Sequence, residues 1–319
     1  MSSIEAVFAA HRARIHAIDE HADVPDVALD DVARVIEVED DQGAGVAVIR
    51  RIEVDPATQM AMWSAPRPWA IGLRLHGDRI GDLASRLLER VDDYLIDNAP
   101  RGNPNHAALV RIAARDVDLV RPLLRHGYAA GTVTALRTVS PDSDAPFEPG
   151  AAIRQARQED RETLIALATA LQKFDASFGT LGEPNELRPL IETLVDSMLE
   201  PDSTLLLVAE TGEGIVGYAS IADPESSDWI TSSTTLAPAA YLGQAYISPA
   251  ARGSGAGTAL TRRLHAEAAE RGWNGILLDY AAPNPLSGPF WSRHGYRPLH
   301  VTWQRRPAHP SLGRGGRVR

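Results

Sequence analysis

The sequence predicts an α/β protein made of two tandem domains, and three observations support this fold class. The chain has 319 residues, which is about two domains by the usual size of a folded unit. It matches itself when it is shifted by 168 positions. A segment rich in proline, serine, aspartate and glycine, residues 140–150, separates the matching halves, and this composition is typical of a domain boundary.

The internal repeat is clearest where a helix pattern runs into a glycine and then a strand pattern. Arg125-His126-Gly127-Tyr128 lies over Arg293-His294-Gly295-Tyr296. The same shift aligns further pairs, which are Val133 with Val301, Arg137 with Arg305, Leu109 with Leu277 and Asp116 with Asn284. Chance identities would not share one register and one order of elements. We therefore divide the chain into a first domain (1–139), a linker (140–150), a second domain (151–306) and a tail (307–319).

Hydrophobic periodicity predicts the elements of both halves. In the first half they are an amphipathic helix over 1–20, a hairpin over Arg34–Glu39 and Val46–Val54, an apolar stretch over Met60–Leu75, a helix with Leu83, Leu87, Val91 and Leu95 on one face, and a loop over 97–106. In the second half they are strands over 152–156, 204–210, 215–221, 241–247 and 275–281, and helices over 160–171, 186–199 and 258–271.

The most informative stretch is Arg252-Gly253-Ser254-Gly255-Ala256-Gly257, which connects the strand over 241–247 to the helix over 258–271. Glycines let successive backbone N–H groups turn toward one point, and the start of a helix adds unpaired N–H groups and a partial positive charge. Arg252 adds a full charge. The loop has no Walker-type lysine, and its glycines do not have the spacing of a dinucleotide site. The sequence therefore predicts an anion site of another kind.

This stretch resembles a known signature. Arg252-x-x-Gly255-x-Gly257 after a strand is similar to (Gln or Arg)-x-x-Gly-x-(Gly or Ala), the acyl-CoA motif of the GNAT superfamily of N-acyltransferases. The second motif of that family is matched in order and spacing by Asn284, Ser287, Phe290, Trp291, Gly295 and Tyr296. The resemblance covers about residues 151 to 306. It implies two tandem GNAT-like domains, each with a mixed, mostly antiparallel central sheet flanked by helices.

The resemblance also implies that acetyl-CoA is the co-substrate and that a neutral amine attacks its thioester without an acyl-enzyme. The residues that would bind acetyl-CoA are Arg252, Gly253, Ser254, Gly255, Ala256, Gly257 and Thr258 at the pyrophosphate, Ala245, Tyr246 and Ile247 along the pantetheine arm, and Asn284 and Trp291 from the second motif. In this family a backbone N–H of the strand that ends at Ile247 also polarises the thioester carbonyl.

The proton donor for the leaving thiolate is open, because Trp291 stands where many family members have a tyrosine. An indole N–H donates a hydrogen bond but is not a workable acid. Ser287, Ser292 and Tyr296 are nearby hydroxyl groups, and a thiol pKa of about 8.5 allows the thiolate to leave without an acid. Tyr296 has a structural alternative as a core aromatic residue, since the first half keeps Tyr128 at the same point.

The base is also open. Family members often have Glu or Asp on the strand before the glycine loop, where this chain offers only Gln244. Asp279 on the next strand could act through water, with Tyr241 as a helper, or serve as a structural hydrogen-bond acceptor. We therefore name Gln244, Asp279 and Tyr296 as the catalytic candidates.

Two segments are expected to shape the acceptor pocket. One is Lys173–Glu186, with Phe174, Phe178 and Glu183. The other is Asp223–Leu236, which is rich in serine and threonine and is either a lid or a disordered surface loop.

The first half lacks an anion loop. Its corresponding stretch, Leu75–Gly81, has too few glycines and places the carboxylate of Asp78 where a pyrophosphate would lie. Like charges repel, so we interpret this half as a degenerate copy that packs against or walls the cleft and does not bind CoA.

Composition excludes several other functions. The net charge of −10 gives little support to a nucleic-acid surface and weak support to a cationic amine substrate. The C-terminal stretch 305–319, with Arg305, Arg306, Arg314, Arg317 and Arg319, is either a basic arm for RNA or an acidic partner, or a disordered solvated end. The chain has no cysteine and its histidines do not have metal-ligand spacing, so neither a metal site nor a disulfide is expected. Without a long apolar run or signal peptide, we expect a cytoplasmic protein with no membrane contact.

These inferences predict an acetyl-CoA-dependent N-acetyltransferase that acts on a primary amine, with a small-molecule amine favoured. The alternatives are acetylation of a protein N-terminus or lysine, and a CoA-binding sensor or partner module without turnover. A tRNA-dependent ligase on the same fold is disfavoured by the acidic body and the intact glycine loop. The sequence does not identify the amine or the oligomeric state.

Overall fold

The structure is a computed structural model that describes residues 3–25, 27, 29, 33–140, 151–179, 182, 184, 186–200 and 204–310. Most of the predicted linker, Glu183 and the arginines of the tail beyond residue 310 lie outside the described residues. Backbone contacts separate the described residues into two compact units. Unit 1 holds residues up to Val133 and from Leu299 onward, and unit 2 holds Thr134–Pro298.

Unit 1 is a mixed, mostly antiparallel sheet with helices packed on it. Its elements are α1 (Ile4–Ile18), β1 (Arg34–Asp40), β2 (Gly43–Arg51), α2 (Met60–Trp63), β3 (Arg67–Gly77), α3 (Ile80–Asn98), β4 (His106–Ala113), η1 (Val117–Leu119), α4 (Val120–Arg125), the first half of β5 (Ala129–Thr138) and most of β11 (Arg297–Arg305). The strand order is β1-β2-β3-β4-β11. β3 and β4 pair in parallel, whereas β1 with β2, β2 with β3 and β4 with β11 pair antiparallel.

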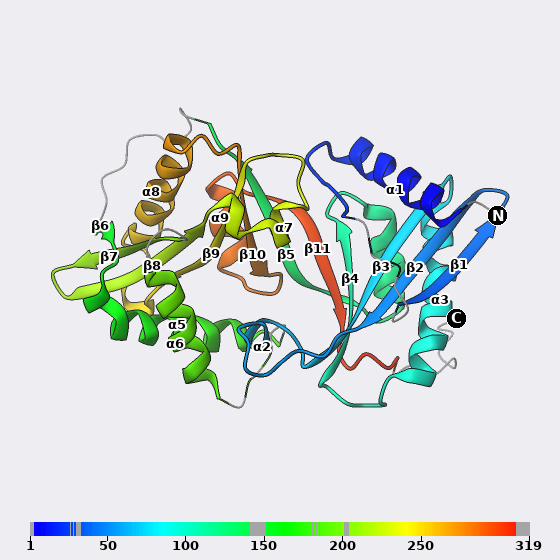
Figure 1. Cartoon of the computed structure of the whole chain (residues 1–319), viewed down its shortest axis with the longest axis horizontal. Coiled ribbons are helices and arrows are strands. Elements are labelled where there is room, and N and C mark those ends of the chain that lie inside the picture. Colours follow the sequence, from blue (N-terminus) through cyan, green and yellow to red (C-terminus); the bar gives the residue numbers. More distant parts are fainter. Residues whose placement is uncertain are drawn as a thin grey trace. The chain divides into compact units, whose positions relative to one another are not determined.

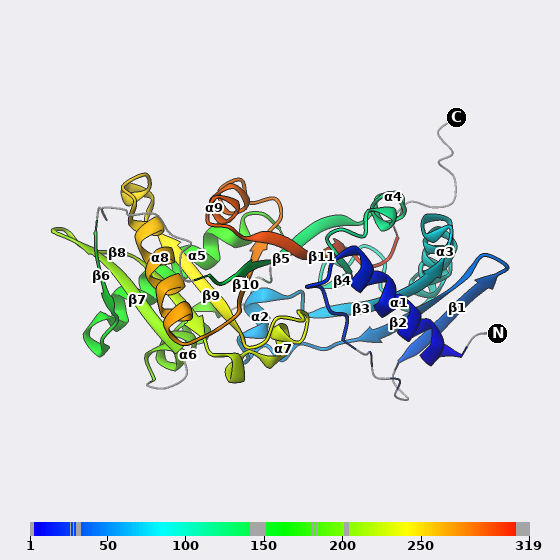
Figure 2. The same ribbon diagram turned by 90° about the horizontal axis from the view of Figure 1, so that it is seen from above.

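The two long helices of unit 1 cover opposite faces of its strands (Figure 2). Alternate residues of β2 point to opposite faces, so that Val46 and Val48 pack with Val7 of α1. Ala47 and Ile49 join the core under α3. The predicted leucine row of α3 is fully buried there, and each such leucine contributes about 1.5–3 kcal/mol.

Unit 2 repeats this plan. Its elements are the second half of β5, β6 (Ala152–Gln155), η2 (Gln158–Asp160), α5 (Arg161–Ala176), α6 (Leu187–Leu199), β7 (Thr204–Thr211), β8 (Gly214–Ala222), η3 (Pro224–Ser226), α7 (Asp228–Thr231), β9 (Ala239–Ile247), η4 (Pro249–Ala251), α8 (Ala256–Glu270), β10 (Gly275–Ala281) and α9 (Ser287–Arg293). The strand order is β5-β10-β9-β8-β7-β6. β9 and β10 pair in parallel, and β6 to β9 pair antiparallel.

The helices of unit 2 divide between the two faces of its strands, with α8 on one face and α5 and α6 on the other (Figure 1). Neighbouring residues of β9 mark these faces. A Cβ on Gly257 of α8 would lie 3.4 Å from the side chain of Ile247. Tyr246 points the other way, toward the face on which Phe174 of α5 lies, and the Arg252 guanidinium contacts both rings. The end of β9 is therefore enclosed by a different helix on each face.

The halves of the sequence exchange a strand between the compact units. β5 belongs to unit 2 from Thr134 onward, and β11 belongs to unit 1 from Leu299 onward. Each exchanged strand carries an arginine that binds the end of a helix in the same compact unit. Arg137 donates to the His294 carbonyl at 2.5 Å, and Arg305 donates to the His126 carbonyl at 2.7 Å. These are equivalent positions of the 168-residue repeat, so the same bond is formed twice.

Several predicted elements differ in detail from those observed. α5 continues to Ala176, past the predicted end at Leu171, because Phe174 in its last turn has a tertiary contact with Arg252. The serine-rich segment Asp223–Leu236 forms η3 and α7 and buries Ile230. At the start of the predicted tail, Ala308 is buried, and its amide donates to the His106 carbonyl at 2.8 Å. Within the described residues, no helix combines the length and apolar character that a membrane crossing needs.

Candidate functional site

The parallel strands β9 and β10 separate halfway along their length. Their pairing runs from Ala239 with Gly275 to Leu242 with Leu278. At this point the register between β9 and β8 shifts by one residue, which leaves Gly243 as a bulge. A bulge bends its strand and increases the local twist. The last residues of β9 therefore pair with β8 alone, and their other edge faces a gap.

The backbone of β9 offers two N–H groups to this gap. In an antiparallel pair the N–H groups alternate between the two edges of the strand. Ser248 donates to the Val216 carbonyl at 2.8 Å, so the N–H groups of Tyr246 and Gln244 also face β8. The N–H groups of Ala245 and Ile247 then face the gap. The predicted pantetheine strand thus has an unpaired edge on the side where an extended ligand could add to it.

The glycine loop lies directly after this strand. Gly253 and Gly255 have φ values of 85° and 90°, which only glycine adopts without strain. The N–H groups of Gly253, Gly255, Gly257 and Thr258 have no hydrogen-bond partner among the described residues. They lie at the N-terminus of the fifteen-residue helix α8, where the helix dipole favours an anion. The local geometry therefore fits a pyrophosphate.

Arg252 stands at the start of the loop. Its Nε donates to the Ile247 carbonyl at 3.3 Å. Its guanidinium lies 5.1 Å from the centre of the Phe174 ring and 5.9 Å from that of Tyr246. The side chain remains exposed, so the aromatic contacts orient the charge while its other N–H groups stay accessible to a ligand.

Gly257 fixes how closely the helix approaches the strand. A Cβ at this position would lie 3.4 Å from both Ile247 and the ring of Phe290. A methyl group would fill that space, and a longer side chain would enter the loop or displace these neighbours. Ala256 beside it is buried, and Ser254 accepts a 3.3 Å hydrogen bond from the Ala256 N–H. These small residues keep the loop free of side chains.

Asn284 lies on the β10 side of the gap. Its Oδ1 accepts hydrogen bonds from the N–H groups of Leu286 at 3.0 Å and Ser287 at 3.4 Å, which holds the start of α9. Its Nδ2 donates to Asp175 of α5 at 3.2 Å. The motif asparagine therefore positions α9 and also contacts the helix on the acceptor face.

Trp291 and Tyr296 form the packing of α9. Trp291 is 7 % exposed and contacts the rings of Phe290 and Tyr296. The hydroxyl of Tyr296 is buried and lies 3.2 Å from His265 Nε2 on α8. The structure therefore brings these two predicted site residues together with α8, away from the acceptor face defined by α5.

The other two catalytic candidates have fixed partners. Gln244 is buried, and its Oε1 accepts a 2.5 Å hydrogen bond from Tyr218 of β8. Asp279 accepts hydrogen bonds from Thr134 at 2.6 Å and from Tyr241 at 3.4 Å. Burial, with the charge of Asp279 adding to it, raises the pKa of the Tyr241 hydroxyl, so this hydroxyl remains a donor.

Aromatic residues extend this face. Trp229 of α7 is 62 % exposed and packs edge-on against Tyr241, with ring centres 5.0 Å apart. The segment Asp223–Leu236 thus covers Tyr241 with an aromatic side chain that is exposed to solvent.

Asp175 is the residue that sequence reasoning missed. It lies in the last turn of α5, within the segment expected to shape the acceptor pocket, but one carboxylate in a polar segment has no distinctive pattern. Burial raises the pKa of its carboxyl to about 6, against a smaller lowering by the Asn284 amide. The structure thus places a carboxyl with a raised pKa beside the motif asparagine.

Unit 1 contains a similar gap, and helix α1 fills it. The parallel pairing of β3 with β4 ends at Ile71 with Val110. Leu75 lies four residues after Ile71. Ile247 lies five residues after Leu242, and one of these five is the bulged Gly243, so Leu75 corresponds to Ile247. Leu75 donates its N–H to His11 Nδ1 at 3.2 Å and accepts at its carbonyl from Arg14 Nε at 3.2 Å. The backbone N–H that is open in unit 2 is therefore satisfied by a side chain of α1 in unit 1.

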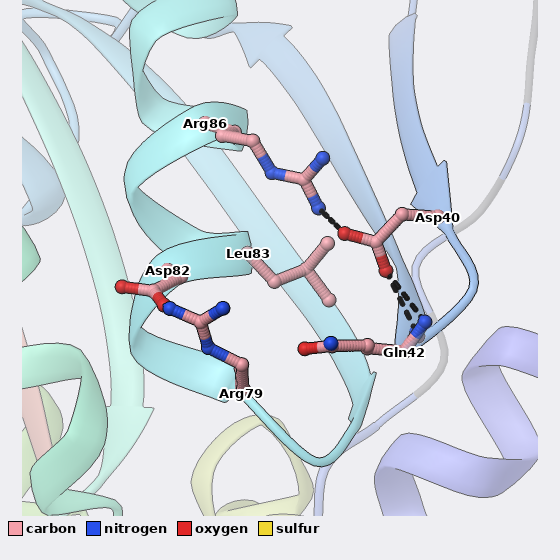
Figure 3. Close-up of a pocket in the computed structure, with 7 residues that line it drawn as sticks. Asp40, Gln42, Arg79, Asp82, Leu83 and Arg86 are labelled. Carbon is pink, nitrogen blue, oxygen red and sulfur yellow. Dashed lines mark hydrogen bonds and ion pairs between the residues drawn. The ribbon is translucent and has the colours of Figure 1, made fainter.

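In unit 1, the stretch that corresponds to the anion loop is also engaged by other groups of the protein. The N–H of Asp78 is used by the Gln42 carbonyl at 3.1 Å. A surface pocket of about 360 Å³ lies beside the first turns of α3 and is lined by Arg79 and Arg86 (Figure 3). These arginines pair with Asp82 and Asp40, respectively. An incoming phosphate would have to compete with a carboxylate at each guanidinium.

In unit 2, a helix start with unpaired N–H groups therefore lies next to a strand with an open edge. The sequence profile described as the Acetyltransferase (GNAT) family matches residues 152–296. Residues 152–296 thus match a GNAT acetyltransferase domain, which supports an N-acetyltransferase and implies acetyl-CoA-dependent acetyl transfer. No curated protein matches the chain.

The chain is similar to several solved structures, of which the first supports the predicted fold class. A GCN5-related N-acetyltransferase from Sphaerobacter thermophilus is 16 % identical, with a TM-score of 0.54, and the match covers 84 % of this chain and 82 % of that one. An enzyme of the same description from Kribbella flavida is 13 % identical over 85 % of this chain and 88 % of that one, with a TM-score of 0.45. PaiA N-acetyltransferase from Thermoplasma acidophilum, in complex with coenzyme A, is 17 % identical over 49 % of this chain and 98 % of that one, with a TM-score of 0.37. The first match extends across both halves, and the prediction of a tandem GNAT-like α/β fold is confirmed.

Proposed function

We propose that this protein transfers the acetyl group of acetyl-CoA to a primary amine in a ternary complex, with a small-molecule amine as the acceptor. The observation that carries the proposal is the open edge of β9 directly before the glycine loop. The pairing of β9 with β10 ends at Leu242, β9 itself ends at Ile247, and the unpaired N–H groups of the loop begin at Gly253. A ligand with an extended amide arm and a pyrophosphate needs these two features in this order.

The residues present fit acetyl-CoA. The loop from Arg252 to Thr258 would bind the pyrophosphate, and the backbone of Ala245, Tyr246 and Ile247 would pair with the amides of the pantetheine arm. Asn284 would close the gap from the β10 side, with Trp291 packed behind it. Bound there, acetyl-CoA supplies a thioester as the acyl donor.

The chain itself would orient and polarise the reacting groups. An N–H of β9 that faces the gap is preorganised by the antiparallel pairing with β8 and would stabilise the negative charge that develops on the thioester oxygen. The amine nitrogen forms a bond to the acyl carbon, the carbon–sulfur bond breaks, and the thiolate leaves with the electron pair. The nitrogen loses one proton, which leaves a neutral amide, and the thiolate takes up a proton to give the CoA thiol. A thiol pKa of about 8.5 makes this departure feasible without a dedicated acid, and we assign Tyr296, bound to His265, to the core.

The choice of a small amine rests on the acceptor face. Both α5 and α7 pack against β9 there, which limits the room for a folded protein substrate. The face carries the carboxylates of Asp175 and Asp279 and the exposed ring of Trp229. Carboxylates and aromatic faces both attract a cation, so a basic amine in its ammonium form is the acceptor that this chemistry favours.

Calorimetric titration of acetyl-CoA into the intact protein tests the site. We expect one binding event per chain, which is lost in the Gly255→Glu, Gly257→Glu variant, because two carboxylates would then lie at the helix start. Gly212→Glu is the control, since this glycine lies in an open turn of the same unit, where a Cβ would have no other atom within 4 Å. Release of the CoA thiol on addition of an amine would complete the test.

Each other outcome has a distinct meaning. The absence of acetyl-CoA binding would overturn the proposal. Binding without thiol release for any amine would instead favour a CoA-binding sensor, and release that occurs only with peptides would favour a protein acetyltransferase.

A further inference from the structure

The C-terminal end of α5 bridges the gap between β9 and β10. Phe174 contacts the Arg252 guanidinium, and Arg252 is bonded to the carbonyl of Ile247 at the end of β9. The next residue, Asp175, is bonded to Asn284, which follows β10. Consecutive residues of one helix turn are therefore tied to the two strands that separate. This places the Asp175 carboxyl over the opening between them, on the face where an acceptor would approach.

The surroundings of Asp175 contain few charges. The titratable groups on the strands beneath are the hydroxyls of Tyr218 on β8 and Tyr246 on β9, and the charge of Asp175 adds to the burial that raises the pKa of Tyr218. Lys173 on the same helix is exposed. The charged groups of α6 pair with one another or with the first turn of α5, at its other end; these are Arg188 with Glu162 and Glu192, and Asp196 with Arg161.

The Asp175 side chain is partly accessible to solvent, and only one of its two carboxyl oxygens has a hydrogen-bond partner in the described part of the chain. Its Oδ1 accepts the hydrogen bond from Asn284, whereas Oδ2 has no partner among the described residues. The other candidates are less suited to accept a proton. Gln244 is an amide, and Asp279 is held by two hydroxyl donors. Burial raises the pKa of Asp175 to about 6, which makes it a stronger base than a solvated aspartate.

Resting on the acetyl transfer proposed above, we infer that Asp175 is the catalytic base, and that Asn284 holds it in place over the gap between β9 and β10. The acceptor enters as an ammonium ion. One N–H bond breaks, and the proton passes to Asp175 Oδ2 while the electron pair stays on nitrogen. The nitrogen then forms its bond to the acyl carbon as the carbon–sulfur bond breaks. Acylation leaves the nitrogen with one further proton to lose; this proton passes to the departing thiolate, which gives the neutral amide and the CoA thiol. The carboxyl returns its own proton to solvent.

The test is the pH dependence of kcat/KM for thiol release from acetyl-CoA by the full chain. The acceptors are butylamine, benzylamine and 1,4-diaminobutane, which all enter as ammonium ions in this pH range. For the wild type we expect kcat/KM to rise with pH through about 6, because the base acts only when it is deprotonated. Asp175→Asn should lose about 100-fold or more in kcat/KM and lose this limb of the profile.

Controls separate the base from the binding site and from folding. Asp175→Asn should bind acetyl-CoA within about 3-fold of the wild type by calorimetry, whereas failure of the cofactor proposal would abolish binding in both. Asp175→Glu restores a carboxyl and should recover part of the rate together with the pH limb. Glu162→Gln removes an exposed carboxylate from the first turn of the same helix. It should change neither the rate nor the pH limb.

Two results would overturn the inference. The first is an Asp175→Asn protein that keeps the rate within a few-fold and keeps the limb near pH 6. The second is a wild-type protein that binds acetyl-CoA but releases no thiol with any of these acceptors, since no base would then be at work.

Discussion

Arg14 on α1 donates two parallel hydrogen bonds, of 2.8 and 2.7 Å, to the carboxylate of Asp116. Asp116 is the repeat counterpart of Asn284, the residue that we assign to the acetyl-CoA site of unit 2. Arg14 also binds the carbonyl of Leu75, the counterpart of Ile247. A side chain of the protein therefore spans, in unit 1, the two positions between which we expect the cofactor in unit 2. This relationship gives a physical reason why unit 1 would not bind a second acetyl-CoA.

Removal of Arg14 should destabilise unit 1. The side chain of Asp116 is only 2 % exposed, and a buried carboxylate left without its partner costs about 3–5 kcal/mol. We expect Arg14→Met to lower the free energy of unfolding in urea by this amount, and Arg14→Met with Asp116→Asn to lower it by less than the sum of the single changes. Arg12→Met is the control, since its pair with Asp23 is exposed and is worth less than about 1 kcal/mol. Equal effects of the two single arginine variants would contradict this account.

His11 should make the protein sensitive to mild acid. Burial and the nearby charges of Arg74 and Arg14 lower the pKa of its imidazole to about 3 in the folded state, whereas an unfolded histidine has a pKa of about 6.5. Below pH 6.5 the unfolded chain gains a proton that the folded chain does not, so stability falls as the pH is lowered toward 3. His11→Gln keeps an acceptor for the Leu75 N–H but cannot be protonated.

Urea unfolding between pH 6.5 and 4.5 measures this effect. Within this range the wild type should lose more stability than His11→Gln, and the difference isolates the histidine from the carboxyl groups that both proteins share. Parallel curves for the two proteins would show that His11 is not the group responsible.

Arg252 should contribute charge to cofactor binding. Its exposed guanidinium is oriented by two aromatic rings beside the loop, and a charge-assisted hydrogen bond to a phosphate contributes about 1.5–3 kcal/mol. We expect Arg252→Met to raise the Kd for acetyl-CoA by about 10-fold or more and to weaken its dependence on salt. Arg263→Met, which removes an exposed arginine paired with Glu267 on α8, should leave the Kd unchanged. An unchanged Kd in both variants would exclude the predicted role of Arg252.

Arg305 should hold the exchanged strand β11 in unit 1. It binds Asp92 at 2.7 Å and the His126 carbonyl at 2.7 Å, and its guanidinium lies 4.7 Å from the ring centre of Tyr128. Arg305→Met should cost about 3 kcal/mol, since it leaves the largely buried Asp92 with His126 as its remaining hydrogen-bond partner. Differential calorimetry should show a lower Tm for the protein, and acetyl-CoA binding below that temperature should be unaffected. Arg306→Met, at the neighbouring position, should have a smaller effect.

The sequence predicted the parts of the fold that depend on local patterns. β10 was expected over Gly275–Ala281 and has these bounds, because its apolar run is bounded by glycine and proline. The glycine loop was located correctly between strand and helix for the same reason, since left-handed φ values and helix starts have strong residue preferences.

Features that depend on distant contacts were not predictable in this way. Gly243 gives no sign of a bulge, because one glycine within a strand fits several conformations. His11 could not be assigned to the gap in unit 1, since its partner Leu75 is 64 residues away. Asp175 has its raised pKa only because folding buries it next to Asn284.

The strand exchange has a consequence for synthesis of the chain on the ribosome. Domains that are continuous in sequence can fold as they emerge, the N-terminal one first. Here the sheet of unit 1 is completed by residues from Leu299 onward, which are translated only after the whole of unit 2. The residues up to Val133 must therefore wait, with the edge of β4 uncovered, until the ribosome has passed Pro298.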